Sequence, residues 1–198
     1  MLRYFFKKKV LSHEVQLAEW ERKGRPAPPP HIVKQMTIDE YRKKFGMNVL
    51  IETGTFLGEM IEAHKNNFKK IFSIELGEKL FARAKKKFRD SSHIHLLQGD
   101  SGVVLHKLMA EIDEPVLFWL DGHYSEGITA LGEKECPVRE ELDAILPNKF
   151  KHVILIDDAR MFNGTHDYPT IEEIKKILEN TGKKFEVEIK DDIIRITQ

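Results

Sequence analysis

The sequence predicts an α/β fold in which helices cover both faces of a mostly parallel sheet. Short and almost uninterrupted apolar runs, such as residues 116–121, are typical of strands buried on both faces of a parallel sheet. Helical segments separate these runs along the chain, which is the order of a doubly wound fold. The last two runs lie on either side of Asp191-Asp192 with no helix between them, so they must pair antiparallel as a hairpin.

Length and composition limit the class of protein. The 198 residues suffice for one domain with a short appendage, and 41% hydrophobic with 32% charged residues indicates a globular chain. Lys+Arg and Asp+Glu both number 32, and this balance weighs against a dedicated nucleic-acid partner. The single cysteine, Cys136, excludes an intrachain disulfide and favours a reducing, cytoplasmic location. No apolar run approaches the roughly 20 residues of a membrane span.

The N-terminal region is expected to be helical and then extended. Residues 2–22 are rich in Lys, Glu and large apolar side chains, which favours a helix. The prolines within residues 26–30 cannot continue a helix and favour an extended spacer. Thr37 and Glu40 then match a capping box, so the next helix is expected at 37–45.

We place the domain boundary after this spacer. Residues 1–36 are a helical arm with its Pro-rich linker, and residues 37–198 are the main domain. The arm is expected to be either a lid over the site or the contact of a homodimer. Strands are expected at 48–52, 70–75, 94–97, 116–121, 152–157, 185–189 and 193–197. Helices are expected at 58–66, 78–88, 103–110, 138–146 and 170–180. The result is a seven-stranded sheet, mostly parallel, with an antiparallel C-terminal hairpin strand.

The first strand-to-helix turn contains two glycines, in Glu52-Thr53-Gly54-Thr55-Phe56-Leu57-Gly58. Gly54 permits a sharp turn, and Gly58 lets the helix pack near the strand. Ligands of open α/β sheets bind beyond the carboxyl ends of the strands, where this turn lies. Phe56 occupies the middle glycine position of the dinucleotide fingerprint, which weighs against a nicotinamide oxidoreductase. Alone, the turn is weak evidence, because tight turns commonly contain glycine.

Acidic residues end the next two predicted strands. Glu75 follows the glycine turn by about 20 residues, a spacing that suits hydrogen bonds to ribose hydroxyls. A solvated carboxylate at a strand end is the alternative. Asp100 precedes Ser101 and can accept a hydrogen bond from an adenine amino group, or it can cap the following helix. The glycine turn and these two acids coincide by chance far less often than any one of them occurs.

Together, Glu52-Thr53-Gly54 with Gly58, Glu75, Asp100-Ser101 and the terminal hairpin resemble the class I S-adenosylmethionine-dependent methyltransferases, which have a Rossmann-like fold. The resemblance covers residues 37–198 and implies S-adenosylmethionine as cofactor. The glycine turn would face its methionine part, Glu75 its ribose and Asp100 its adenine. Phe56 departs from the small residue that many members have, which leaves open how the turn packs on the cofactor. The implied cofactor-binding residues are Glu52, Thr53, Gly54, Thr55, Gly58, Glu75, Asp100, Ser101 and Asp121.

A second group of acids follows the fourth and fifth predicted strands. Asp121 ends the fourth strand, and Asp157-Asp158 end the fifth, which should be its neighbour. Three crowded carboxylates repel one another unless a cation joins them. Oxygen ligands favour Mg²⁺, Mn²⁺ or Ca²⁺. The sequence therefore predicts that Asp121, Asp157 and Asp158 bind a divalent cation, most simply magnesium. Alternatively, the Asp pair caps the following loop and Asp121 contacts cofactor or substrate directly.

This second pattern is similar to catechol O-methyltransferases and, more closely, to macrocin-type sugar O-methyltransferases. The catechol enzymes carry a lysine three residues past the first aspartate, where this chain has Tyr124. His123 is therefore the nearest candidate base, since histidine side chains ordinarily titrate near neutral pH. A buried, hydrogen-bonded loop histidine is the alternative interpretation.

The sequence therefore predicts a methyltransferase that uses S-adenosylmethionine to methylate an oxygen of a small hydroxylated substrate, such as a sugar or a phenol. The metal would orient two substrate oxygens and lower the hydroxyl pKa, and His123, beside Asp121, would take the proton. Two alternatives remain open. One is a metal-free methyltransferase that acts on nitrogen or on a larger partner. The other is a non-catalytic binding module that keeps the fold.

Overall fold

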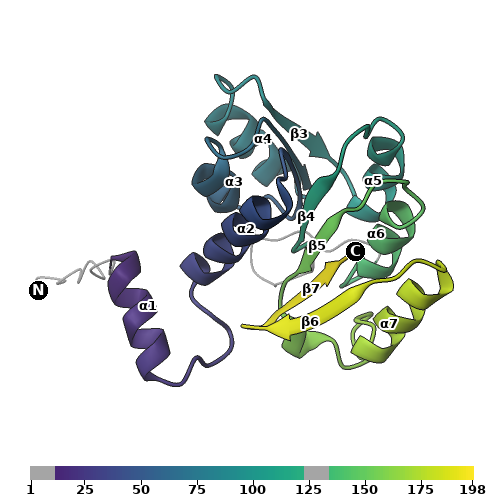
Figure 1. The fold of residues 1–198 in the computed structure, drawn as a ribbon. Coiled ribbons are helices and arrows are strands. Elements are labelled where there is room, and N and C mark those ends of the chain that lie inside the picture. Colours follow the sequence, from purple (N-terminus) through teal and green to yellow (C-terminus); the bar gives the residue numbers. More distant parts are fainter. Residues whose placement is uncertain (1–11, 123–133) are drawn as a thin grey trace, which may run out of the picture.

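The computed structural model describes residues 12–122 and 134–198, and Figure 1 shows their arrangement. In these residues seven strands form one sheet in the order β3-β2-β1-β4-β5-β7-β6. The strands are β1 (Val49–Thr53), β2 (Lys70–Glu75), β3 (Ile94–Gln98), β4 (Val116–Leu120), β5 (Val153–Ile156), β6 (Glu186–Lys190) and β7 (Ile193–Thr197). Strands β1 to β5 are parallel, whereas β7 is antiparallel to both β5 and β6. The predicted mixed sheet is confirmed.

Helices cover both faces of the sheet. They are α1 (His13–Arg22), α2 (His31–Phe45), α3 (Glu59–His64), α4 (Glu78–Lys87), α5 (Ser101–Met109), α6 (Val138–Ile145) and α7 (Ile171–Asn180), with a 3₁₀ turn at Ala159–Met161. Figure 1 shows α2, α3 and α4 on one side of the sheet and α5, α6 and α7 on the other. This confirms the predicted doubly wound arrangement. None of the helices within 12–122 and 134–198 has both the length and the apolar composition that crossing a bilayer requires.

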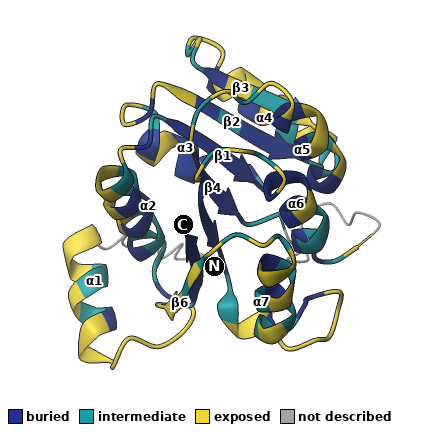
Figure 2. Cartoon of the chain, turned by 45° about the vertical axis from the view of Figure 1, so that its right-hand side comes forward, coloured by how far each residue is buried: buried dark blue, intermediate teal, exposed yellow. Residues whose placement is uncertain are grey.

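The central strands are buried on both faces, as their apolar runs predict. Every residue of β1 and β4 is buried, which Figure 2 shows as dark blue arrows in the middle of the molecule. Because side chains alternate along a strand, each strand contributes to two cores. Leu50 and Leu117 pack with α2, α3 and α4, whereas Ile51 and Phe118 pack with α5, α6 and α7.

The start of α2 differs from the prediction. The helix begins at His31, directly after Pro30, whose φ of −58° suits a helix entrance. Thr37 is therefore no N-cap, and its hydroxyl donates to the Val33 carbonyl within the helix at 3.0 Å. The capping-box interpretation is wrong here because a proline that ends one segment also starts a helix well. The predicted boundary between residues 36 and 37 falls inside α2.

Other helix boundaries agree with their sequence signals. Thr170 caps α7, and its side chain and that of Glu173 make the reciprocal bonds of a capping box. Gly46 ends α2 in the left-handed region, with φ of 67°. Pro137 precedes α6, where its missing N–H is tolerated.

The described part of the arm attaches to its own chain. The indole Nε1 of Trp20, at the end of α1, donates to the Pro26 carbonyl at 2.8 Å. Arg25 then forms an ion pair with Asp191, with 3.0 Å between Nη2 and Oδ2. Asp191 lies in the turn between β6 and β7, and Figure 1 shows α1 on that side of the molecule.

Candidate functional site

The turn between β1 and α3 lies against the ends of its neighbouring strands. The Gly54 N–H donates to the Ile74 carbonyl at 2.9 Å. Gly54 has a φ of +83°, and a Cβ there would lie 2.2 Å from the Asp121 carbonyl oxygen. Only glycine fits this approach. Gly58 is also in the left-handed region, but a Cβ there would meet the Phe88 ring at 2.7 Å. It therefore fits α3 against the end of α4 rather than against a strand.

Glu75 joins this turn to the next one. Its Oε2 accepts from the Phe56 N–H and its Oε1 from the Gly77 N–H, both at 2.8 Å. A carboxylate offers about four lone-pair directions, so each oxygen can accept a further bond, as ribose hydroxyls require. Phe56 adopts a φ of +47° and is 42% exposed, so the residue in the fingerprint's glycine position takes the backbone conformation that glycine favours.

Asp100 and Ser101 follow β3 as predicted, at the start of α5. Asp100 caps the helix, because its Oδ1 accepts from the Gly102 N–H at 2.9 Å, and this leaves Oδ2 for another donor. Ser101 Oγ donates to Glu141 Oε1 at 2.6 Å. Glu141 comes from α6 and is fully buried. A Cβ at Gly122 would lie 3.2 Å from Glu141 Oε1 and 3.3 Å from Ser101 Oγ, so β4, α5 and α6 meet here.

Three of the predicted cofactor residues are buried at the end of β1 and in the turn that follows it. Glu52, Thr53 and Thr55 are each at most 2% exposed. Ser73 Oγ on β2 lies 2.6 Å from both Glu52 Oε2 and Thr55 Oγ1. Thr53 Oγ1 accepts from the Asp121 N–H at 3.2 Å. These hydrogen bonds hold the turn in place, and the contact of the three side chains with a cofactor stays a prediction.

Glu52 is protonated at neutral pH. Burial raises the pKa of its carboxyl to about 8, the Ser73 hydroxyl opposes this shift, and the charges of Asp121 and Glu75 add to it. The folded protein thus holds a proton between pH 4.5 and about 8 that the unfolded chain releases. Stability conferred by the buried site therefore falls as the pH rises through this window.

Glu52→Gln is expected to be more stable than the wild type at pH 8, by several degrees in Tm, and close to it at pH 5. The amide keeps the shape of the protonated acid but has no proton to lose, and each pKa unit corresponds to about 1.4 kcal/mol. Thermal unfolding of both proteins at the two pH values measures this. A difference in Tm that is the same at pH 5 and pH 8 would contradict the assignment.

The ends of β4 and β5 bring the second group of acids near one another. The Asp157 N–H donates to the Leu120 carbonyl at 3.0 Å, next to Asp121. Asp157 is 1% exposed, and Lys34 of α2 forms a hydrogen-bonded ion pair with its Oδ2. Lys34 Nζ also lies 3.9 Å from Asp158 Oδ1. We call Asp121, Asp157 and Asp158 the acid cluster.

Lys34 is charged in this position. Burial alone would lower the pKa of its ammonium, but Asp157, Asp121 and Asp158 outweigh burial and hold the pKa above its usual value. Burial raises the pKa of Asp157, and the Lys34 ammonium opposes that shift. The side chain of Lys34 is 15% exposed, so solvent screens this charge only weakly.

The acid cluster does not have the form of a metal site. Within residues 12–122 and 134–198, no group of three His, Cys, Asp or Glu side chains is placed to hold a metal ion. Asp158 is bound by Arg160 as well, with 2.8 Å between Nη1 and Oδ1. Basic side chains thus contact two of the three predicted ligands. The metal stays a prediction, and His123, the predicted base, lies outside the described residues.

Sequence reasoning missed the residues that α2 contributes. His31 and Lys34 lie three apart at the start of the helix, so they share a face. His31 Nδ1 lies 2.8 Å from Gln35 Nε2, and burial lowers the pKa of its imidazole. Reading Pro30 as a helix start would have placed both residues on the helix. Glu141 gave no such signal, because glutamate in a first helical turn is ordinarily exposed.

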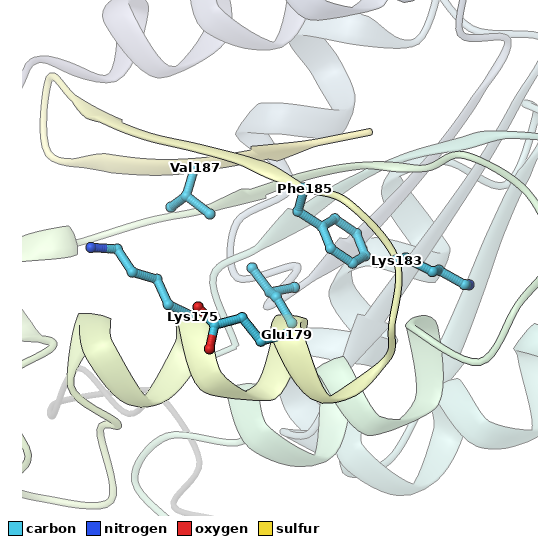
Figure 3. Close-up of a pocket in the computed structure, with 6 residues that line it drawn as sticks. Lys175, Glu179, Lys183, Phe185 and Val187 are labelled. Carbon is cyan, nitrogen blue, oxygen red and sulfur yellow. The ribbon is translucent and has the colours of Figure 1, made fainter.

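A separate groove with a volume of about 260 Å³ lies between α7 and β6. Figure 3 shows its lining residues Lys175, Leu178, Glu179, Lys183, Phe185 and Val187. Lys183 Nζ bonds the carbonyls of Leu146 and Asn148, just before β5 begins. The groove therefore lies toward the amino end of β5, away from the strand ends that carry the candidate site.

No family model and no curated protein matches the sequence, whereas solved structures match the fold. An O-methyltransferase from Bacillus cereus, in complex with S-adenosylhomocysteine, is 14% identical with a TM-score of 0.56, and the match covers 93% of this chain and 90% of that chain. The O-methyltransferase TomG from Streptomyces achromogenes, in complex with S-adenosylmethionine, is 11% identical with a TM-score of 0.60, and the match covers 98% of this chain and 93% of that chain. A putative rRNA methylase from Clostridium thermocellum is 17% identical with a TM-score of 0.56, and the match covers 82% of this chain and 94% of that chain. The chain therefore has the Rossmann-like fold of the class I S-adenosylmethionine-dependent methyltransferases.

Proposed function

We propose that this protein is an enzyme that transfers a methyl group from S-adenosylmethionine to an oxygen of a small hydroxylated substrate, such as a sugar or a phenol. One observation carries the proposal: Gly54, Glu75 and Asp100 lie at the carboxyl ends of three adjacent strands, β1, β2 and β3. Ligands of open α/β sheets bind beyond these ends. Two of the similar structures are O-methyltransferases with S-adenosylhomocysteine or S-adenosylmethionine bound, which supports the same cofactor here.

Each of these residues has a defined role toward the cofactor. The turn at Gly54 lets the cofactor approach the backbone at the end of β1. The Glu75 oxygens are oriented by the N–H groups of Phe56 and Gly77, and they would accept from the two ribose hydroxyls. Asp100 caps α5 with Oδ1, and its other carboxylate oxygen would accept from the adenine amino group. When bound, S-adenosylmethionine supplies an electrophilic methyl group, so the protein needs no covalent nucleophile.

The acid cluster is the proposed substrate end of the site. Asp121 adjoins both the glycine turn and Asp157, so it lies between the cofactor residues and the other acids. The protein's task here is to orient the substrate hydroxyl and remove its proton. We propose His123 as the base on its sequence position alone. The divalent cation that the sequence predicts on the acid cluster, acting together with this base, stays untested, and Lys34 contacts two of its three predicted ligands.

RNA is the second candidate substrate. One structural neighbour is named a putative rRNA methylase, which favours keeping this class in the test. The equal numbers of acidic and basic residues weigh against it.

We further propose a cytoplasmic location, from the single cysteine. The sequence also predicts a homodimer that forms through the arm, and this stays a proposal. In the structure, Arg25 of the arm forms an ion pair with Asp191 of its own chain.

Transfer of tritium from methyl-labelled S-adenosylmethionine tests the proposal. The acceptors are a panel of catechols, phenols and sugars and, separately, total RNA. We expect label in a small molecule with the wild type, at least about 100-fold less with Asp121→Asn, and wild-type rates with Asp113→Asn, a matched change of an exposed acid before β4. Label in RNA alone would replace the small-molecule proposal by the second candidate. No label in any acceptor would favour a binding module.

A further inference from the structure

We propose that Lys34 supplies the positive charge of the acid cluster in place of a divalent cation. Its ammonium would hold Asp157 and Asp158 and offer a remaining N–H to the substrate oxygen. The contact with substrate rests on the function proposed above. The exclusion of a divalent cation does not, and it can be judged even if the protein transfers no methyl group.

The position of Lys34 is built into the fold. It extends from α2, and the buried side chains of Val33, Ile38 and Tyr41 fix that helix on the sheet. The helix contacts β4 and β5, the two strands that end in the acid cluster. Its start at Pro30 places Lys34 in the first turn, over the ends of these strands. The ammonium is therefore held in place by the packing of a whole helix.

Asp157 requires a cation. It is 1% exposed, and its Oδ1 is buried without a hydrogen-bond partner among the described residues. A carboxylate removed from water in this way is costly unless a positive charge compensates it. Lys34, on Oδ2, provides that charge. A divalent ion that bound Asp157 would have to displace the ammonium or lie beside it, against the repulsion of two cations.

Asp158 has a basic partner besides Lys34. Arg160 contacts Asp158 and also forms an ion pair with Asp192, so Asp158 has a basic partner on its other side. An ammonium has three N–H donors. Lys34 gives one to Asp157, and its separation of 3.9 Å from Asp158 is a charge contact rather than a hydrogen bond. It therefore keeps donors for a substrate oxygen, the part that a metal ion would otherwise play.

Manganese binding to the full chain tests the exclusion directly. Mn²⁺ is titrated into the protein, and electron paramagnetic resonance follows the signal of the free hydrated ion. We expect no stoichiometric binding by the wild type up to about 1 mM, and one bound Mn²⁺ per chain in Lys34→Met, with at least about tenfold higher affinity. Lys34→Met/Asp157→Asn should lose that ion again. One Mn²⁺ bound by the wild type and lost in Asp157→Asn would overturn the proposal, as would no gain in Lys34→Met.

Thermal unfolding tests the ion pair. Removing one partner of a buried pair is strongly destabilising, so Lys34→Met is expected to lower the Tm by about 5–10 °C. Adding Asp157→Asn should recover at least half of this loss, since no uncompensated charge then remains. Lys43→Met is the matched control on the same helix, because Lys43 pairs with Asp39 but its side chain is 66% exposed, and we expect a shift of at most about 2 °C. Equal shifts in Lys34→Met and Lys43→Met would overturn the proposal.

Cofactor binding and turnover separate this proposal from the proposed function. Lys34→Met should bind S-adenosylhomocysteine like the wild type, because Gly54, Glu75 and Asp100, the residues proposed to hold its three parts, lie at the ends of β1, β2 and β3. With a substrate found, methyl transfer should be undiminished in EDTA, reduced at least about 100-fold in Lys34→Met and partly restored in Lys34→Arg. If the wild type binds no cofactor, the proposed function is wrong, and the manganese and unfolding experiments alone then decide whether Lys34 replaces a divalent cation. Turnover that EDTA abolishes would overturn the role of Lys34.

Discussion

Glu75→Ala is expected to weaken binding of S-adenosylhomocysteine by about 100-fold or more. The carboxylate would hold both ribose hydroxyls, and a hydrogen bond to a charged group contributes about 1.5–3 kcal/mol. Losing two such bonds corresponds to at least two factors of ten in Kd. Isothermal titration of both proteins with S-adenosylhomocysteine measures the change.

Glu75 also accepts from the N–H groups of Phe56 and Gly77, so the alanine variant disturbs two turns as well. Glu75→Gln provides the control, because it keeps the shape and one acceptor oxygen while it removes the charge. We expect about tenfold weaker binding and a smaller loss in Tm than in Glu75→Ala, because the amide oxygen keeps one of the two bonds to backbone N–H groups. If Glu75→Gln and Glu75→Ala both bind S-adenosylhomocysteine as tightly as the wild type, Glu75 does not hold the cofactor.

Gly54→Ala is expected to lower the Tm by about 10 °C or more, or to prevent folding. The residue has a φ of +83°, and the new Cβ would lie 2.2 Å from the Asp121 carbonyl oxygen and 2.9 Å from its carbon. Both are backbone atoms just past the end of the neighbouring strand β4, so the clash cannot be relieved by the rotation of a side chain. The ends of β1 and β4 must separate, which also moves the turn that would face the cofactor. Thermal unfolding and titration with S-adenosylhomocysteine measure both effects.

Gly46→Ala separates this clash from the cost of the backbone conformation. Gly46 also lies in the left-handed region, with φ of +67°, but a Cβ there would have no atom within 4 Å. A left-handed conformation costs a non-glycine residue about 1–2 kcal/mol, which in a chain of this length lowers the Tm by a few degrees. If Gly54→Ala loses no more stability than Gly46→Ala, the close approach of β4 does not constrain the turn.

The strands could be predicted because runs of consecutive apolar residues are typical of strands that are buried on both faces. The run at 116–121 matches β4, and all five of its residues are buried. The pair Asp191-Asp192, both at positive φ, marks the hairpin that closes the sheet. Topology then follows, since strands without a connecting helix must pair antiparallel. This is why the edge of the sheet that carries Glu75 and Asp100 could be located before the structure.

Lys34 could not be found in the same way. The capping-box pattern at Thr37 and Glu40 is a local signal, and the position of α2 over the ends of β4 and β5 depends on tertiary packing. A surface lysine and a lysine that contacts a buried and a half-buried aspartate have the same local sequence pattern. The sequence therefore predicted that the acid cluster needs a cation. The metal ion stays a prediction, whereas the structure places the ammonium of Lys34 against two of the three acids.

The difference between contact and support residues also depends on packing. Glu52, Thr53 and Thr55 belong to the predicted motif, and all three are buried and bonded within the protein, while their contact with a cofactor stays a prediction. Ser73 and Glu141 bond to motif residues from β2 and α6 and have no motif of their own. A pattern in one segment shows which positions are special, whereas the partner of each side chain comes from segments 20 to 40 residues away.

Titration of the wild-type chain with S-adenosylhomocysteine, with and without Mg²⁺, tests the central claim most directly. We expect one molecule to bind per chain with a Kd in the micromolar range, about −8 kcal/mol, and with the same affinity in both conditions. That result would establish the cofactor and justify the search for a substrate. No heat of binding in either condition would contradict the methyltransferase assignment and leave a protein that shares the fold without the cofactor.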